Sequence, residues 1–168
     1  PAASAAFSAC RAAISEGEAE AIRQFVREGG TLVADSFCGL YDGHGNPKEM
    51  LADVLGLHQN LTPPKLEDAS LELTDSPLAG APRRLTVTSG ASGIRLAGAR
   101  AYGMLNGMPA LMVNPFGKGK AIFLNASFSN YSEEISGGIG GEVQVGRMNS
   151  FAVVGPIREL LSALIREA

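Results

Sequence analysis

The most regular hydrophobic pattern in the first part of the chain predicts a helix over residues 16–28. Its apolar residues recur at helical spacing and are Ala19, Ile22, Phe25 and Val26. Ser15 and Glu18 have the spacing of a capping box, in which each side chain binds the backbone amide of the other residue. Gly29 can take the left-handed conformation that commonly ends a helix.

Directly after this helix, residues 31–36 (TLVADS) begin with a run of apolar positions. Such a run is typical of a strand whose two faces are both covered by helices. A helix, a Gly-Gly pair and a buried strand together form one half of a βαβ unit. The opening segment, residues 1–15, is weakly patterned, and we interpret it as a strand remnant.

A second helix is expected over residues 47–55. Asn46 can cap it, Pro47 suits the first helical position, and Glu49 would complete a second capping box. Gly56 is then in place to end the helix.

The second half of the chain changes to period-2 alternation, which predicts half-exposed, antiparallel strands. The alternating segments are SLELT, RLTVT and GIRLAG. PALMVNP and KAIFLN, joined by FGKGK, predict a hairpin, because Gly117 and Gly119 can supply the positive φ that its turn needs. An apolar stripe from Val153 to Ile165 predicts a terminal helix.

One long segment, residues 132–150 (SEEISGGIGGEVQVGRMNS), is rich in glycine and has no pattern. A segment of this length is either a mobile loop or an arm that contacts another subunit, and the sequence leaves both interpretations open.

Composition favours a single globular domain over residues 1–168, because 45% of the residues are hydrophobic and 18% are charged. The net charge of -3 leaves no basic excess for nucleic acid. No apolar run approaches the roughly 20 residues of a membrane span, so we expect a soluble protein without a membrane partner. Cys10 and Cys38 do not reveal the compartment, although a cytoplasmic location is slightly favoured.

Candidate chemistry concentrates in the loop after the buried strand, where open α/β sheets bind ligands. The polar and reactive residues of this loop are Asp35, Ser36, Cys38, Tyr41, Asp42 and His44. Cys38 could be a nucleophile if His44 served as its base and Asp42 oriented the imidazole. The favoured interpretation is structural, with Cys38 as a small buried side chain and Asp42 and His44 closing an ordered turn. The only other histidine, His58, has no acidic partner nearby in sequence.

No metal or cofactor is expected. Asp35, Asp42 and His44 match none of the common metal-binding spacings. The glycine-rich FGKGK and GGIGG segments lack the spacing of phosphate-binding loops. Glu133 and Glu134 are neighbours in a polar segment, which is typical of solvated carboxylates rather than of a glycosidase pair.

The segment ISEGEAEAIRQFVREGGTLVADSFCGLYDGHGNP, followed by LADVLGL, resembles the class I glutamine amidotransferase-like domain of family 42 β-galactosidases, known as their trimerisation domain. The late hairpin and the terminal helix are similar to that domain too. The resemblance implies a flavodoxin-like α/β three-layer sandwich, with a mainly parallel sheet and a late antiparallel hairpin. It also implies that the first strand and helix of the fold precede Pro1. The chain is then either a fragment or one domain of a larger polypeptide, or a domain whose first strand comes from elsewhere.

The same resemblance implies a domain that sits beside a catalytic barrel and lacks the Cys-His-Glu triad of amidotransferases. In agreement, no His-x-Glu follows KAIFLN. The leading hypothesis is therefore a non-catalytic accessory or oligomerisation domain of a larger carbohydrate-active enzyme, whose partner is a neighbouring domain or a second copy. The alternatives are a cysteine-dependent amidotransferase or hydrolase using Cys38, and a small-molecule or sugar-binding module using Asp35, Ser36 and Tyr41.

Overall fold

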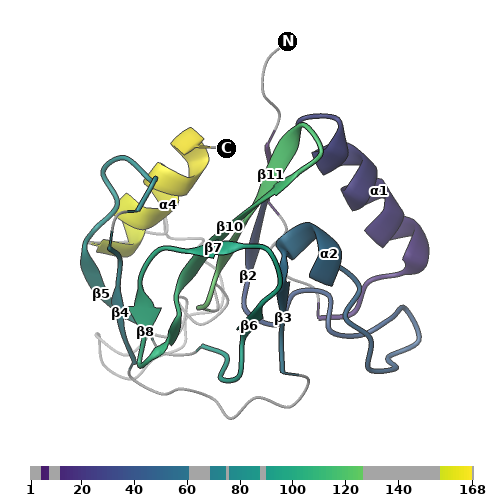
Figure 1. Ribbon diagram of the computed structural model, residues 1–168, viewed down its shortest axis with the longest axis horizontal. Coiled ribbons are helices and arrows are strands. Elements are labelled where there is room, and N and C mark those ends of the chain that lie inside the picture. Colours follow the sequence, from purple (N-terminus) through teal and green to yellow (C-terminus); the bar gives the residue numbers. More distant parts are fainter. Residues whose placement is uncertain are drawn as a thin grey trace, which may run out of the picture.

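The centre of the molecule is a mixed five-stranded sheet (Figure 1). The computed structural model describes residues 5–7, 12–60, 69–74, 76–87, 90–126 and 156–167. In spatial order the strands are β1 (Ala5–Phe7), β2 (Thr31–Asp35), β11 (Gly119–Leu124), β10 (Leu111–Phe116) and β7 (Arg100–Ala101). β1 and β11 pair with β2 in parallel, whereas β10 pairs antiparallel with both β11 and β7. The late antiparallel hairpin is thus present as predicted. The sheet as a whole is mixed rather than mainly parallel, because β7 adds a second antiparallel pairing.

The predicted buried strand is confirmed as β2. All five of its residues are buried, and Val33 lies opposite Ile122 of β11. Successive side chains of a strand point to opposite faces. Accordingly, Leu32 and Ala34 belong to one hydrophobic core and Val33 belongs to another.

The first predicted helix is confirmed as α1 (Glu16–Arg27). Its capping box is formed, with the amide of Ser15 donating to Glu18 Oε2 at 2.7 Å and the amide of Glu18 donating to Ser15 Oγ at 3.2 Å. The strand remnant expected before it is β1, so β1, α1 and β2 form a βαβ unit. A further strand and helix ahead of Pro1 stay a prediction.

The second helix begins later than predicted. It is α2 (Ala52–Leu55), and Asn46, Pro47 and Glu49 do not cap it. Pro47 instead forms a β-bridge with Tyr41, since the chain turns back on itself before the helix. Gly56 ends the helix as predicted, with φ of 64°.

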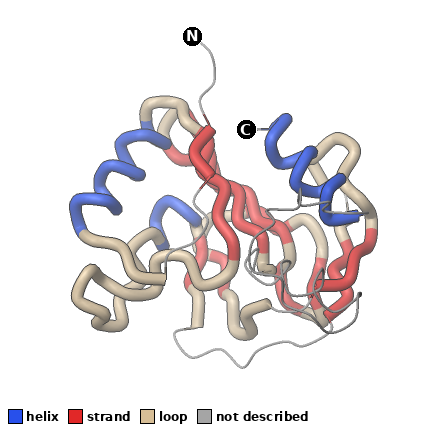
Figure 2. Tube along the Cα trace, turned by 180° about the vertical axis from the view of Figure 1, so that it is seen from behind, coloured by secondary structure: helices blue, strands red, loops and turns tan. Residues whose placement is uncertain are grey.

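Two hydrophobic cores lie on opposite faces of the central sheet. α1 and α2 cover one face, and α4 (Pro156–Glu167) covers the other together with a four-stranded antiparallel sheet (Figure 2). That sheet has the order β5 (Arg84–Val87), β4 (Ala69–Glu72), β8 (Met104–Leu105) and β9 (Met108–Pro109). A two-stranded ribbon of β3 (Leu57–His58) and β6 (Arg95–Leu96) completes the strands of the described residues. The antiparallel strands and the terminal helix expected from the sequence are thus present.

Two hairpin turns show where glycine is required. In the β10–β11 turn, Gly117 has φ of 64° as predicted, but Gly119 does not have a positive φ. Gly119 is needed for space, because a Cβ there would lie 2.1 Å from the carbonyl oxygen of Gly30. The β8–β9 turn is formed by Asn106 and Gly107, both with positive φ, which is the pattern of a type I′ turn.

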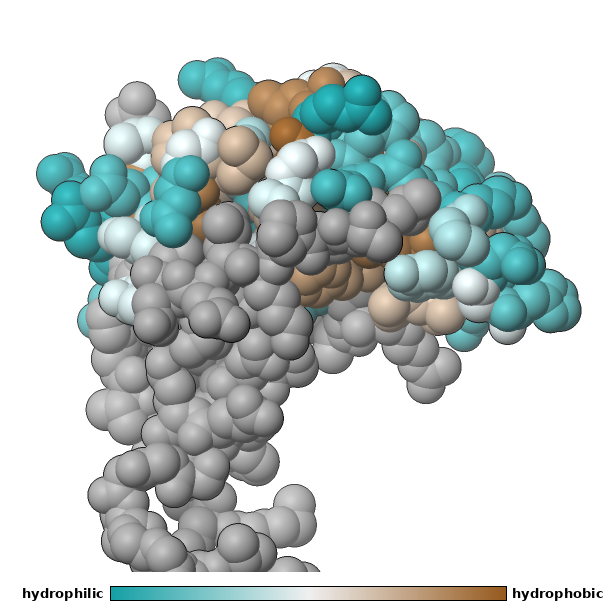
Figure 3. All heavy atoms as spheres, turned by 90° about the horizontal axis from the view of Figure 1, so that it is seen from below, coloured by the Kyte–Doolittle hydropathy of each residue, from teal (hydrophilic) through white to brown (hydrophobic). Residues whose placement is uncertain are grey.

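The surface over α1 and the loop after β2 is mostly hydrophilic (Figure 3). In the part of the chain that the structure describes, no helix is long and apolar enough to cross a membrane. The glycine-rich segment 132–150, Cys10, Glu133 and Glu134 lie outside the described residues.

Candidate functional site

The candidate site lies where β2 and β11 end at the same edge of the central sheet. The two strands are parallel, and Asp35 pairs with Leu124 at their carboxyl ends. The amide of Ser36 donates to the carbonyl of Ala126 at 3.3 Å, which joins the segments that follow β2 and β11. This is the edge at which open α/β sheets commonly bind ligands.

Cys38 is enclosed in the core at this edge rather than presented to solvent. It is 1% exposed and packs with residues of α1 and α2. The residue before it, Phe37, has φ of 75°, a conformation that L-residues rarely adopt. The backbone strain of this turn therefore lies at Phe37, and the Cys38 side chain points into the core. A thiol enclosed in this way does not suit a nucleophile.

Asp42 closes the next turn of the loop. Its Oδ1 accepts the amides of His44 and Asn46, both at 2.9 Å, and its Oδ2 accepts the side-chain amide of Asn46 at 3.0 Å. These bonds, with the Asn46 side chain first, lower the pKa of Asp42. Asp42 thus contacts the backbone of His44 rather than its ring.

The structure does not assemble a Cys38, His44 and Asp42 triad among the described contacts. His44 is exposed, Cys38 is buried, and no hydrogen bond that the described residues make joins the thiol to the imidazole. The other loop candidates are also largely enclosed. Asp35 and Ser36 are 4% and 2% exposed, and Tyr41 is half-buried, with β-bridges to Ala13 and Pro47.

A polar network that the sequence did not predict holds the backbone of this loop. His58 Nδ1 lies 2.8 Å from Glu49 Oε2, and Glu49 Oε1 accepts the amide of Gln59 at 2.5 Å. The buried side chain of Gln59 then accepts the amide of Phe37 at 2.9 Å and donates to the carbonyl of Cys38 at 2.8 Å. The inference that His58 lacks a nearby acidic partner is therefore wrong, because Glu49 precedes it across α2.

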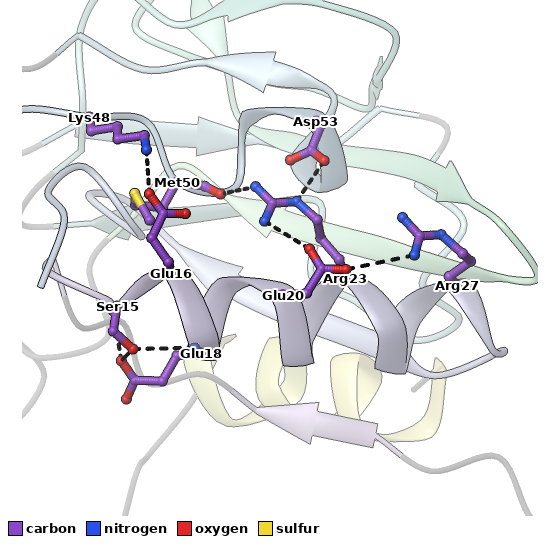
Figure 4. A network of polar contacts seen from close by, with 9 residues as sticks. All are labelled: Ser15, Glu16, Glu18, Glu20, Arg23, Arg27, Lys48, Met50 and Asp53. Atoms are coloured by element: carbon purple, nitrogen blue, oxygen red, sulfur yellow. Dashed lines mark hydrogen bonds and ion pairs between the residues drawn. The ribbon is translucent and has the colours of Figure 1, made fainter.

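A second network fastens the loop and α2 to α1 (Figure 4). Arg23 Nε donates to Asp53 Oδ2 at 2.8 Å, and another guanidinium nitrogen donates to the carbonyl of Met50 at 2.7 Å. The bond to Asp53 is the main cause of the raised pKa of Arg23. Lys48 pairs with Glu16 on the same side. The bonds of Glu49 and Gln59, and the bond from Arg23 to Met50, hold backbone groups in place, which is a structural role.

Metal ligation has no support among the described residues, because they contain no group of three or more His, Cys, Asp or Glu side chains that could hold an ion. The hydroxyl oxygen of Ser36 is buried and makes no hydrogen bond in the described part of the chain. One such group is too little to define a cofactor site.

The chain is similar to part of known β-galactosidases. No family model matches it. Over 131 residues it is 31% identical to β-galactosidase BgaB of Geobacillus sp. (strain Y412MC61), an alignment that covers 70% of this chain and 18% of the relative. The β-galactosidase bgaB of Geobacillus kaustophilus shows the same identity and coverage. The chain thus spans about a fifth of the length of these relatives.

Solved structures show the same relationship in the fold. The β-galactosidase of Bacillus circulans sp. alkalophilus matches with a TM-score of 0.65 and 19% identity, over 74% of this chain and 20% of that one. Gan42B, a GH42 β-galactosidase of G. stearothermophilus, matches with a TM-score of 0.59 and 20% identity, over 79% of this chain and 21% of that one. Fold and sequence therefore relate the chain to one part of a known class of glycoside hydrolases. More particularly, the chain is homologous to part of the GH42 β-galactosidases.

Proposed function

We propose that this chain is a non-catalytic accessory and assembly domain of a larger β-galactosidase-like glycoside hydrolase, corresponding to the amidotransferase-like trimerisation domain. The observation that carries the proposal is the partial match, since most of this chain aligns with only 18% of a β-galactosidase. The βαβ unit and the helices on both faces of the sheet are consistent with a flavodoxin-like sandwich.

The loop after β2 supports a non-catalytic role. A cysteine nucleophile needs a base within hydrogen-bond reach and access to its substrate. Cys38 is enclosed in the core, and the carboxylate of Asp42 accepts hydrogen bonds from two backbone amides. Asp35 and Ser36 are similarly enclosed, which disfavours a sugar-binding loop in this position.

Two measurements on the 168-residue chain test the proposal. First, we expect no hydrolysis of a nitrophenyl β-galactoside and no release of ammonia from glutamine, with Cys38→Ala as the matched control. Glutamine hydrolysis that Cys38→Ala abolishes would favour the cysteine-dependent enzyme instead.

Second, we expect the sedimentation coefficient to rise with protein concentration, because an assembly domain keeps a surface for its partner. A variant without residues 133–147 shows whether the glycine-rich segment contributes to that association. A monomer at every concentration would contradict the assembly role of this chain.

A further inference from the structure

The connection between β4 and β5 lines an open pocket that is separate from the loop after β2. Its volume is about 400 Å³, within the range of about 300–1,000 Å³ that is usual for small-molecule sites. The described residues that line it are Leu73, Thr74, Ser76, Leu78, Ala81, Pro82 and Arg83. The connection lies beside α4 in both ribbon views, on the far side of the central sheet from α1 (Figures 1 and 2).

Hydrogen bonds hold the pocket in shape. The amide of Leu73 donates to the carbonyl of Arg83 at 2.9 Å and closes the base of the connection. Within it, the amide of Leu78 donates to Ser76 Oγ at 3.1 Å. Arg166 of α4 donates to the carbonyl of Ala79 at 3.1 Å, which ties the connection to a helix. A site held in this way loses little entropy when it binds a ligand.

The lining has three kinds of groups. Leu73 and Leu78 are buried and form an apolar surface together with Pro82. Thr74 presents a hydroxyl, and Ser76 keeps a hydroxyl proton to donate, because its described bond uses only the oxygen as acceptor. The charged group is the exposed guanidinium of Arg83.

The charge of Arg83 is not balanced by any partner among the described residues. Its neighbour Arg84 pairs with Glu72 at 2.5 Å, and the acidic side chain at the end of α4, Glu167, pairs with Lys120 at 2.6 Å. Arg166 brings a second positive charge to the same connection. A guanidinium binds a carboxylate through two parallel hydrogen bonds, so this pocket favours an anionic ligand.

We propose that the β4–β5 connection is a binding site for a small hydroxylated carboxylate of the hexuronic acid class. Arg83 binds the carboxylate, Thr74 and Ser76 exchange hydrogen bonds with the hydroxyls, and the C–H face of the sugar ring packs on Leu73, Leu78 and Pro82. A neutral sugar would leave the guanidinium without a partner among the described residues, and a simple fatty acid would leave the two hydroxyls unused. The site does not depend on the assembly role proposed above.

Calorimetric titration of the 168-residue chain with D-galacturonate tests the site. We expect saturable binding, and we expect D-galactose and hexanoate each to bind at least tenfold more weakly. Arg83→Gln should weaken galacturonate binding at least tenfold, whereas Arg84→Gln should leave it unchanged, because Arg84 is paired with Glu72 outside the pocket. Thr74→Val should weaken it severalfold without affecting hexanoate.

Three results would overturn the proposal. One is the absence of saturable galacturonate binding up to about 10 mM, a concentration high enough to detect a dissociation constant of about 1 mM. Another is an equal loss in Arg83→Gln and Arg84→Gln. The third is that Arg83→Gln dissociates an oligomer of the chain while free galacturonate does not bind, because the carboxylate would then come from a protein side chain.

Discussion

Replacing Gln59 by leucine tests whether the strained turn after β2 is held by a single side chain. Gln59 is 8% exposed, and its amide group makes one bond to the backbone of Phe37 and one to that of Cys38. Leucine has a similar volume and no polar atoms. Gln59→Leu therefore removes both bonds and leaves an amide and a carbonyl unpaired next to the core.

The expected loss follows from the two orphaned groups. Each buried polar group that loses its partner costs about 1–3 kcal/mol, and the added apolar surface of leucine returns about 1 kcal/mol. The free energy of unfolding should therefore fall by about 1–5 kcal/mol, a substantial share of the roughly 5–15 kcal/mol typical of a domain. With an m value of about 2 kcal/mol/M, the urea midpoint falls by about 0.5–2.5 M.

Urea unfolding followed by far-ultraviolet circular dichroism measures this shift. Gln24→Leu is the matched control, because Gln24 lies exposed on α1 and bonds only to Glu28 in the described structure. It should change the free energy of unfolding by no more than about 0.5 kcal/mol. In a Cys10→Ser background, Cys38 should also react faster with a thiol reagent once Gln59 is replaced. Equal midpoints for the two leucine variants would refute the argument.

Three further predictions concern the backbone and the loop. Gly119→Ala should destabilise the chain by several kcal/mol in urea unfolding, because its Cβ would meet backbone oxygens, whereas Gly17→Ala has open space in α1 and should stabilise it by up to about 1 kcal/mol. Asn106→Ala should lower the free energy of unfolding by about 1 kcal/mol and Asn106→Gly should not, since only alanine is strained at the positive φ there. The pKa of Asp42 is lowered in the folded state. Its contribution to stability is therefore present above the ordinary value of 3.8 and is lost as the pH falls through the folded pKa. The free energy of unfolding, measured from pH 6 to pH 3, should accordingly depend less on pH in Asp42→Asn than in the parent chain.

Elements whose signals are local could be predicted from the sequence. The Ser15 and Glu18 capping box, the apolar run of β2 and the β10–β11 hairpin each depend on residues close together in the chain. The Asn106 and Gly107 turn is a signal of the same kind, and it was readable but missed. Local chemistry was therefore a sufficient guide where no distant group competed.

The errors lie where a distant partner takes a side chain away from its local role. Asn46 and Glu49 have capping-box spacing, yet Asn46 bonds to Asp42 and Glu49 bonds to His58 and Gln59. These bonds require the reversal of the chain between β2 and α2, which spacing alone does not reveal. The same holds for Gly119, whose requirement comes from the close approach of Gly30 and Val26 rather than from its own φ.

The position of β11 between β2 and β10 has a consequence for how the chain acquires its structure. β10 and β11 are consecutive, and such hairpins close within microseconds. β2, by contrast, pairs with β11, which is synthesised only after the whole segment from Ser36 to Lys118. During translation its inner edge stays unpaired and both of its faces are apolar, which is the condition under which nascent chains aggregate. A ribosome that stops before Gly119 therefore releases a chain in which the central strand pairing cannot form.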